Sequence, residues 1–96
     1  MRLSQKDINI IKNVVYQYLD DAKITLFGSR VYNNKKGGDI DIFVETKYNI
    51  SMKQKLEILT KIELDGILRK VDMIFKTPLS KYKSIFDTIE KEGIIL

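Results

Sequence analysis

The chain has 96 residues, a formal net charge of +4, 44% hydrophobic residues, and neither cysteine nor histidine. This length supports one domain, and the apolar fraction argues against disorder. The missing residue types exclude disulfide frameworks, thiolate nucleophiles, Ser-His-Asp triads and zinc sites built on Cys or His. Any catalysis must therefore use carboxylates, hydroxyls, Lys, Arg or the backbone, and a bound metal should be a hard cation such as Mg²⁺ held by oxygen.

Charge and hydropathy say little about large partners. No stretch approaches the roughly 20 apolar residues that a membrane span needs, and the first seven residues lack the apolar core of a signal peptide. We therefore expect a soluble, cytoplasmic protein that does not interact with membranes. Basic side chains are spread evenly, with 8 in residues 1–50 and 9 in residues 51–96. No dedicated nucleic-acid surface is expected, because such a footprint is normally clustered.

The first half of the chain predicts one helix and two strands. Ser4 can cap a helix, with Asp7 at the capping-box position. Its apolar face has residues spaced by three and four, namely Ile8, Ile11, Val15 and Tyr18. Residues 23–27 form a β-rich run that ends at Gly28, which predicts a strand and a tight turn. Residues 30–38 have loop chemistry, and residues 39–45 alternate like a second strand.

The middle of the chain predicts a second helix. Ser51 can cap it, Gln54 completes a capping box, and Gly66 is expected to end it. The apolar residues at helical spacing are Leu56, Leu59 and Ile62 or Glu63.

The last third predicts a strand over residues 67–76 and a final helix. Thr77 and Pro78 resemble a helix N-cap followed by proline at the first helical position, and Gly93 suits the C-terminal stop. The stripe expected on this helix is Tyr82, Ile85, Phe86 and Ile89. The apolar tail 94–96 could join the sheet edge or the core. This order predicts a single α/β (α+β) domain over residues 1–96, with a mixed three- to four-stranded sheet packed with helices.

Asp39 and Asp41 are the strongest chemical signal. Residues i and i+2 of a strand point to the same side, so both carboxylates should be aimed together while Ile40 and Ile42 face the core. Like charges at this separation repel unless a cation or a proton lies between them, and Mg²⁺ would relieve the repulsion. The alternative is two acids on the solvated face of an edge strand, since the pattern is short and common.

Gly28, Ser29 and Asp72 add to this signal. A glycine turn after residues 23–27 lets the backbone approach a ligand closely, and Ser29 supplies a hydroxyl and an N–H group. Asp72 interrupts an apolar run on the predicted third strand, as functional residues often do. The alternatives are an ordinary strand-ending turn and an exposed acid that pairs with Lys70 or Lys76.

These elements together resemble the nucleotidyltransferase signature of the DNA polymerase beta superfamily. Phe27-Gly28-Ser29, nine intervening residues and Asp39-Ile40-Asp41-Ile42 match its Gly-Ser and Asp-x-Asp elements. A later strand carries the third acid, which Asp72 fits. The length, Arg30 after Gly-Ser and the ending 90–96 are similar to minimal nucleotidyltransferases, the antitoxin halves of MNT/HEPN toxin–antitoxin pairs.

The resemblance implies a palm fold and a role for each matched residue. Asp39 and Asp41 would hold two Mg²⁺ ions, and Asp72 would bind the catalytic metal and help to deprotonate the attacking hydroxyl. Gly28 and Ser29 would hold the β- and γ-phosphates, and Arg30 would steady the triphosphate. The implied reaction is transfer of AMP from ATP to a hydroxyl, expected to be a tyrosine of a partner HEPN ribonuclease.

The chain departs from the family pattern at three positions. Tyr32 replaces a basic residue, which puts one triphosphate contact in doubt. Asn33 stands where the family often has Gly and can adopt the same left-handed conformation, and Gly38 stands where Ser often precedes the first Asp. Two other functions remain open. One is an antitoxin that inhibits by contact alone, and the other is a small-molecule nucleotidyltransferase.

Overall fold

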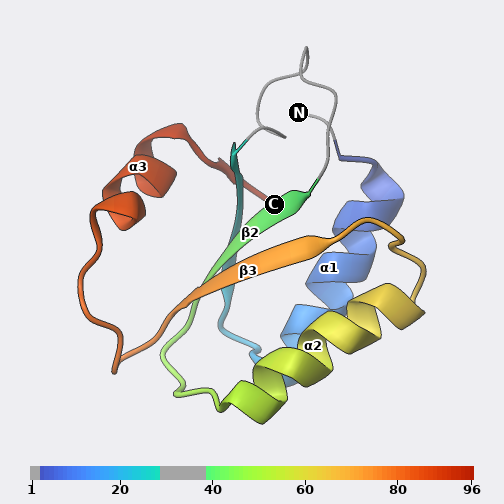
Figure 1. Ribbon diagram of the computed structural model, residues 1–96, viewed down its shortest axis with the longest axis horizontal. Helices are drawn as coiled ribbons and strands as arrows, with labels where there is room; N and C mark the ends of the chain where they lie inside the picture. The colour runs from blue at the N-terminus through green and yellow to red at the C-terminus, as the bar shows by residue number, and fades with distance from the viewer. Residues whose placement is uncertain (1–2, 29–38) are drawn as a thin grey trace.

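Residues 3–28 and 39–96 are described by the structure, a computed structural model of the chain. In these ranges the chain forms three α-helices and one four-stranded sheet (Figure 1). The elements are α1 (Gln5–Tyr18), β1 (Lys23–Phe27), β2 (Ile40–Glu45), α2 (Met52–Leu64), β3 (Val71–Lys76), α3 (Ser84–Glu92) and β4 (Ile94–Ile95). The predicted α+β fold with a mixed sheet is confirmed. None of the described helices is long and apolar enough to cross a membrane.

The sheet has the strand order β3-β2-β1-β4. β2 runs parallel to β3, and α2 forms the crossover between them, as parallel neighbours require. β1 pairs antiparallel with both β2 and β4. β2 is therefore a central strand, and its residues are held in register by a neighbour on each side.

The main hydrophobic core lies between one face of the sheet and helices α1 and α2. Ile40, Ile42 and Val44 of β2 are fully buried in it. The side chains of β3 that pack against the same core are Val71, Met73 and Phe75. Strand periodicity predicted this face for Ile40 and Ile42 of β2, and the packing confirms it. Asp41 and Asp72 follow on the opposite face, because successive strand residues alternate.

The opposite face of the sheet is covered in part by α3 (Figure 1). Phe43 of β2 lies 5.4 Å from Phe86 of α3, centroid to centroid, in a tilted arrangement that aromatic pairs favour. Ile89 completes this buried cluster, and Phe27 and Ile74 pack against it. α3 is thus attached to the sheet by a small, mainly aromatic cluster that is separate from the main core.

Both predicted helix caps in the first two-thirds of the chain are confirmed. The Ser4 hydroxyl accepts a hydrogen bond of 3.1 Å from the Asp7 amide. Ser51 and Gln54 form a complete capping box, with bonds of 3.1 and 3.0 Å in the two directions. These bonds satisfy amides that have no partner inside the helix.

The buried face of α2 differs from the prediction. Ile58 and Ile62 are buried, whereas Leu56 is 56% exposed and Leu59 is half-buried. α2 carries apolar side chains on two faces, so spacing alone does not select one of them. The choice is made by packing, because Ile58 and Ile62 face the shared core with α1 and the sheet.

Two predicted boundaries in the last third are wrong. β3 begins at Val71 rather than at residue 67, because the ladder with β2 starts where the Ile40 amide bonds to the Lys70 carbonyl at 2.9 Å. α3 begins at Ser84 rather than at Pro78, and Lys83 caps it without a side-chain bond.

Thr77 and Pro78 belong to a turn instead of a helix start. Ser80 closes it, since its amide donates to the Thr77 carbonyl at 3.0 Å and its hydroxyl accepts from the Thr77 amide at 2.9 Å. Proline suits the second position of a turn as well as the first turn of a helix, because both need the same φ. Tyr82 therefore lies before α3 and is exposed, and only Phe86 and Ile89 of the predicted stripe are buried.

The apolar tail joins the sheet edge as β4, which pairs with Thr25 and Leu26 of β1. Gly93 ends α3 just before it. A Cβ at Gly93 would collide with the Thr25 side chain and lie 2.6 Å from the Ile89 carbonyl oxygen.

Gly93→Ala is therefore expected to displace β4 from β1. Overpacking of this kind lowers the free energy of unfolding by about 1–3 kcal/mol. Urea unfolding measures the loss, with the neighbouring Glu92→Ala as the control for a change that adds no collision. An unchanged midpoint for Gly93→Ala would show that the tail is not held at this distance.

Asp21 joins the turn before β1 to the end of β2. Its carboxylate accepts a hydrogen bond of 2.6 Å from the Thr46 hydroxyl and one of 2.7 Å from the Lys47 amide. These two bonds favour the charged form and hold the pKa of Asp21 below its ordinary value of 3.8.

Asp21→Asn is expected to lower the thermal unfolding midpoint by a few degrees at neutral pH. The stabilisation by Asp21 is present above pH 3.8 and is lost as the pH falls through the lowered pKa of the folded state. The difference between wild type and variant should therefore shrink in acid. Thermal unfolding from neutral pH down to pH 2 tests this, and a difference independent of pH would contradict it.

Candidate active site

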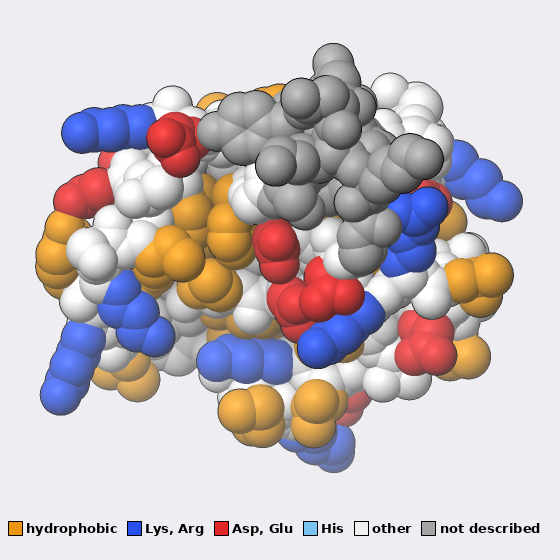
Figure 2. All heavy atoms as spheres, turned by 45° about the horizontal axis from the view of Figure 1, so that its top comes forward, with side chains coloured by type: hydrophobic (Ala, Val, Ile, Leu, Met, Phe, Trp, Pro, Cys, Tyr) orange, Lys and Arg blue, Asp and Glu red, His pale blue; other side chains and the backbone are white. Residues whose placement is uncertain are grey.

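The candidate site lies at the start of β2 and β3, on the sheet face that points away from the main core. Asp41 and Asp72 are direct partners in the parallel register of these strands. Neighbouring strands are about 4.8 Å apart, so side chains on the same face at partnered positions are immediate neighbours. Figure 2 shows acidic side chains gathered at the middle of one face of the molecule.

Charge and burial act together on Asp41. Partial burial raises the pKa of its carboxyl group above the ordinary value, and the nearby charges of Asp72 and then Asp39 raise it further. Both causes disfavour the charged form. Two negative carboxylates held side by side in this way attract a proton or a cation.

Asp72 is partly exposed and contacts a lysine. The Lys70 ammonium lies 3.6 Å from its carboxylate, and the Asp72 side chain is 45% exposed. This contact is one of the two pairings considered as an alternative for Asp72 in the sequence, whereas Lys76 pairs with Glu45 at 3.5 Å. An exposed pair contributes little to stability, so Lys70 can leave Asp72 at a small cost when a ligand approaches.

Gly28, directly after β1, lies against the carboxylate of Asp41. It follows Phe27, the register partner of Asp41, and has φ +75. A Cβ at Gly28 would collide with Asp41 Oδ2 and lie 3.2 Å from its Cγ. Glycine is required here for two reasons, the left-handed backbone and the close approach of the carboxylate.

The other predicted site residues lie at the edge of this arrangement or outside the described residues. Asp39 is exposed and lies one residue before β2. Ser29 and Arg30 fall outside the described residues. The structure therefore brings together Gly28, Asp41 and Asp72, with Asp39 close enough to influence the Asp41 pKa. In residues 3–28 and 39–96, no three acidic side chains form a group arranged to bind one metal ion.

The chemistry of the donors fits a hard divalent cation. Carboxylate oxygens are the ligands that Mg²⁺ prefers, and no softer donor lies among the residues of the pair. The raised pKa of Asp41 marks a repulsion that a cation between the carboxylates would relieve. Asp41 and Asp72 are thus the side chains that would hold such an ion, with Asp39 beside them.

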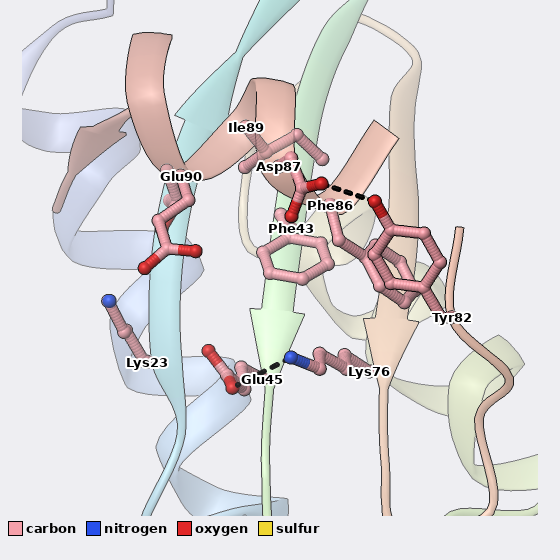
Figure 3. A pocket seen from close by; sticks show the side chains of 10 residues that line it. Lys23, Phe43, Glu45, Lys76, Tyr82, Phe86, Asp87, Ile89 and Glu90 are labelled. Carbon is pink, nitrogen blue, oxygen red and sulfur yellow. Dashed lines mark hydrogen bonds and ion pairs between the residues drawn. The ribbon is translucent and has the colours of Figure 1, made fainter. Parts of the chain in front are cut away.

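A pocket of about 180 Å³ lies beneath α3, on the same sheet face but at the other end of the strands (Figure 3). A row of charged side chains crosses its floor, with Lys23, Glu45 and Lys76 on three successive strands. Tyr82 donates a hydrogen bond to Asp87 on its α3 side. The acidic pair is four residues away along β2, or about 13 Å.

Sequence reasoning did not predict this pocket. The sequence signal for it was the alternation that places Lys23 at the start of β1, and Glu45 and Lys76 at the ends of β2 and β3, on the face shared with the acidic pair. α3 begins at Ser84, six residues after the predicted start at Pro78. The segment before α3 therefore lies beside the sheet, and its Tyr82 lines the pocket.

Comparison with known families defines the class of protein. A family model described as polymerase beta, nucleotidyltransferase matches residues 9–96. The chain therefore belongs to the polymerase beta nucleotidyltransferase family, and its general activity is transfer of a nucleotidyl group. No curated protein gives a significant match to the chain.

Proposed function

We propose that this nucleotidyltransferase uses Mg²⁺ to transfer AMP from ATP to a hydroxyl group of another protein. The acceptor in this proposal is a tyrosine of a partner HEPN ribonuclease, which the chain silences as its antitoxin. The observation that carries the chemistry is the register pair Asp41–Asp72, with Gly28 in contact with Asp41. The HEPN partner rests on the resemblance to minimal nucleotidyltransferases.

The reaction is an in-line displacement at the α-phosphorus of ATP. The acceptor oxygen forms a bond to phosphorus, the bond to the bridging oxygen breaks, pyrophosphate leaves, and the hydroxyl proton passes to a base. When bound, Mg²⁺ would neutralise charge on the attacking and leaving oxygens. Asp72 is the candidate base, because its side chain is 45% exposed and can meet an incoming hydroxyl.

Gly28 sets the distance between backbone and ligand in this proposal. The absence of a side chain lets the end of β1 approach Asp41 directly, and phosphate groups could approach the same backbone. In this proposal Asp41, held against Gly28, positions the acidic pair, and Asp72 faces the acceptor hydroxyl.

The direct test is incubation with α-labelled ATP, Mg²⁺ and the product of the neighbouring gene, followed by intact mass of both proteins. We expect the partner to gain one or more AMP units, and Asp39→Asn/Asp41→Asn to abolish the gain. Glu92→Gln, an exposed acid at the end of α3, is the matched control and should transfer normally.

Three outcomes contradict the proposal in different ways. Transfer that is unchanged in Asp39→Asn/Asp41→Asn would remove the acidic residues from the chemistry. A stable complex without a mass change, in which the acid variant still suppresses toxicity, would make the chain an inhibitor by contact alone. A gain of mass on a small hydroxyl compound, but not on the partner, would show a small-molecule nucleotidyltransferase.

A further inference from the structure

α2 carries a second apolar face that the fold does not use. Ile58 and Ile62 point into the core, whereas Leu56 is 56% exposed and Leu64 is 79% exposed. Leu56, Thr60 and Leu64 are spaced by four residues, so they form one stripe along the outer side of the helix. Large side chains grouped on one exposed face are typical of an interaction surface.

Charged residues flank this stripe on one side. Lys53, Glu57, Lys61 and Asp65 are also spaced by four residues and alternate in sign. Such a row would support the helix through i, i+4 pairs. In the structure, however, no two of these four side chains lie within ion-pair distance, and Lys61 donates to Gln17 of α1 instead.

The order of the charges is self-complementary when two copies of α2 run antiparallel. Lys53 and Asp65 are equally far from residue 59, and so are Glu57 and Lys61. A two-fold axis beside residue 59 therefore places each lysine opposite an acid of the second copy. A two-fold interface uses the same patch on both subunits, so this complementarity is the property that it needs.

The apolar stripe has the same symmetry. Leu56 and Leu64 are equally far from Thr60. Across the axis, Leu56 of one copy therefore lies opposite Leu64 of the other, and the two copies of Thr60 lie opposite each other. The centre of the stripe and the centre of the charged row differ by one residue. Because the helix rises only about 1.5 Å per residue, one two-fold axis between residues 59 and 60 serves both rows.

We propose that the exposed face of α2, made of Lys53, Leu56, Glu57, Thr60, Lys61, Leu64 and Asp65, binds a second copy of this chain in an antiparallel, two-fold symmetric dimer. Four cross-subunit ion pairs flank four leucines in this arrangement. α2 covers the sheet face opposite Asp41 and Asp72. Both candidate active sites of the dimer therefore face outward and remain open.

The oligomeric state is measured by sedimentation equilibrium of the full chain over a range of concentrations. The mass of one chain is 11.2 kDa, and we expect a concentration-dependent rise to twice that value. A wild type that stays monomeric at millimolar concentration would overturn the proposal. The same holds if only a different protein binds to this face.

Charge reversal then tests the arrangement of the helices. Lys53→Glu places an acid opposite Asp65 of the second copy, and Asp65→Lys places a lysine opposite Lys53 of the second copy. Each change creates two repulsive contacts, one on either side of the axis. Each variant alone is expected to raise the dimer dissociation constant about tenfold or more. Lys81→Glu, in the exposed segment before α3, has the same change of charge as Lys53→Glu and should leave the constant unchanged.

The two variants complement each other. In a mixture of Lys53→Glu with Asp65→Lys chains, both cross-subunit pairs are attractive again, so heterodimers should form with about the wild-type affinity. The double variant Lys53→Glu/Asp65→Lys should also dimerise like wild type. If mixing does not restore association, the antiparallel register is wrong and the proposal is overturned.

Loss of folding does not explain these expected results. Lys53 lies in the first turn of α2 and Asp65 caps its C-terminal end. The carboxylate that Lys53→Glu introduces and the ammonium that Asp65→Lys introduces would each interact favourably with the helix dipole. Circular dichroism and thermal unfolding should therefore show folded variants, and restoration on mixing requires folded chains in any case.

Discussion

Replacing Asp41 with Asn is expected to reduce nucleotidyl transfer about 100- to 1,000-fold while leaving the chain at least as stable as wild type. Asp41 is half-buried, and its pKa is raised by burial and by the charges of Asp72 and Asp39. Asn keeps the size of the side chain and removes the repulsion. The variant therefore loses a ligand for the cation. In the protein without metal, it also loses the repulsion from Asp72 and Asp39.

The pH dependence of stability follows from the direction of this shift. A raised pKa means that the folded state holds the proton more tightly than the unfolded state. The contribution of Asp41 is therefore most favourable below its ordinary pKa of 3.8 and is lost as the pH rises through the raised pKa. Asp21 has the opposite sign, since its pKa is lowered.

The comparison of Asp41→Asn with Asp21→Asn makes the prediction specific. At neutral pH the first variant should unfold at the wild-type temperature or slightly above it, and the second should unfold below it. Mg²⁺ with ATP should raise the unfolding temperature of wild type and Asp21→Asn, because a ligand stabilises the state that binds it. It should not protect Asp41→Asn. If Mg²⁺ with ATP raised the unfolding temperature of both variants equally, Asp41 would not be a ligand of the cation.

Gly28→Ala is expected to damage both stability and activity. Alanine is strained at φ +75, and its Cβ would push directly against the carboxylate of Asp41. The backbone strain costs about 1–3 kcal/mol. The displaced carboxylate should lower transfer by about 100-fold, because misplacement of a positioning group by about 1 Å has effects of this size.

Gly66→Ala is the matched control for this prediction. Gly66 also has a positive φ, +122, but a Cβ there would have only Ile10 Cδ1 nearby, at 4.0 Å. Its substitution should destabilise the chain by a similar amount and leave transfer unchanged among the folded molecules. Transfer assays and urea unfolding of the two variants separate strain from damage to the site. Equal activity in both would show that Gly28 does not position Asp41.

Local patterns in the sequence determined the elements that carry the candidate site. Strand alternation placed Ile40 and Ile42 in the core and Asp41 on the other face, because the period of two is a property of a single strand. Serine caps determined where α1 and α2 begin, since their bonds join residues three apart. The motif from Gly28 to Asp41 and the later Asp72 predicted the family, which the family comparison confirmed.

Only the tertiary structure decided how those elements meet. The parallel register that sets Asp41 beside Asp72 joins residues 31 positions apart, and no local period encodes it. The same holds for the choice between the two apolar faces of α2, where core packing selected Ile58 and Ile62 and left Leu56 outside. Proline at residue 78 suited a turn and a helix start equally well, and Ser80 decided in favour of the turn. In each case the free energy that selected the observed structure came from contacts between residues distant in sequence or from one competing hydrogen bond. The periodicity of the sequence carries no information about either.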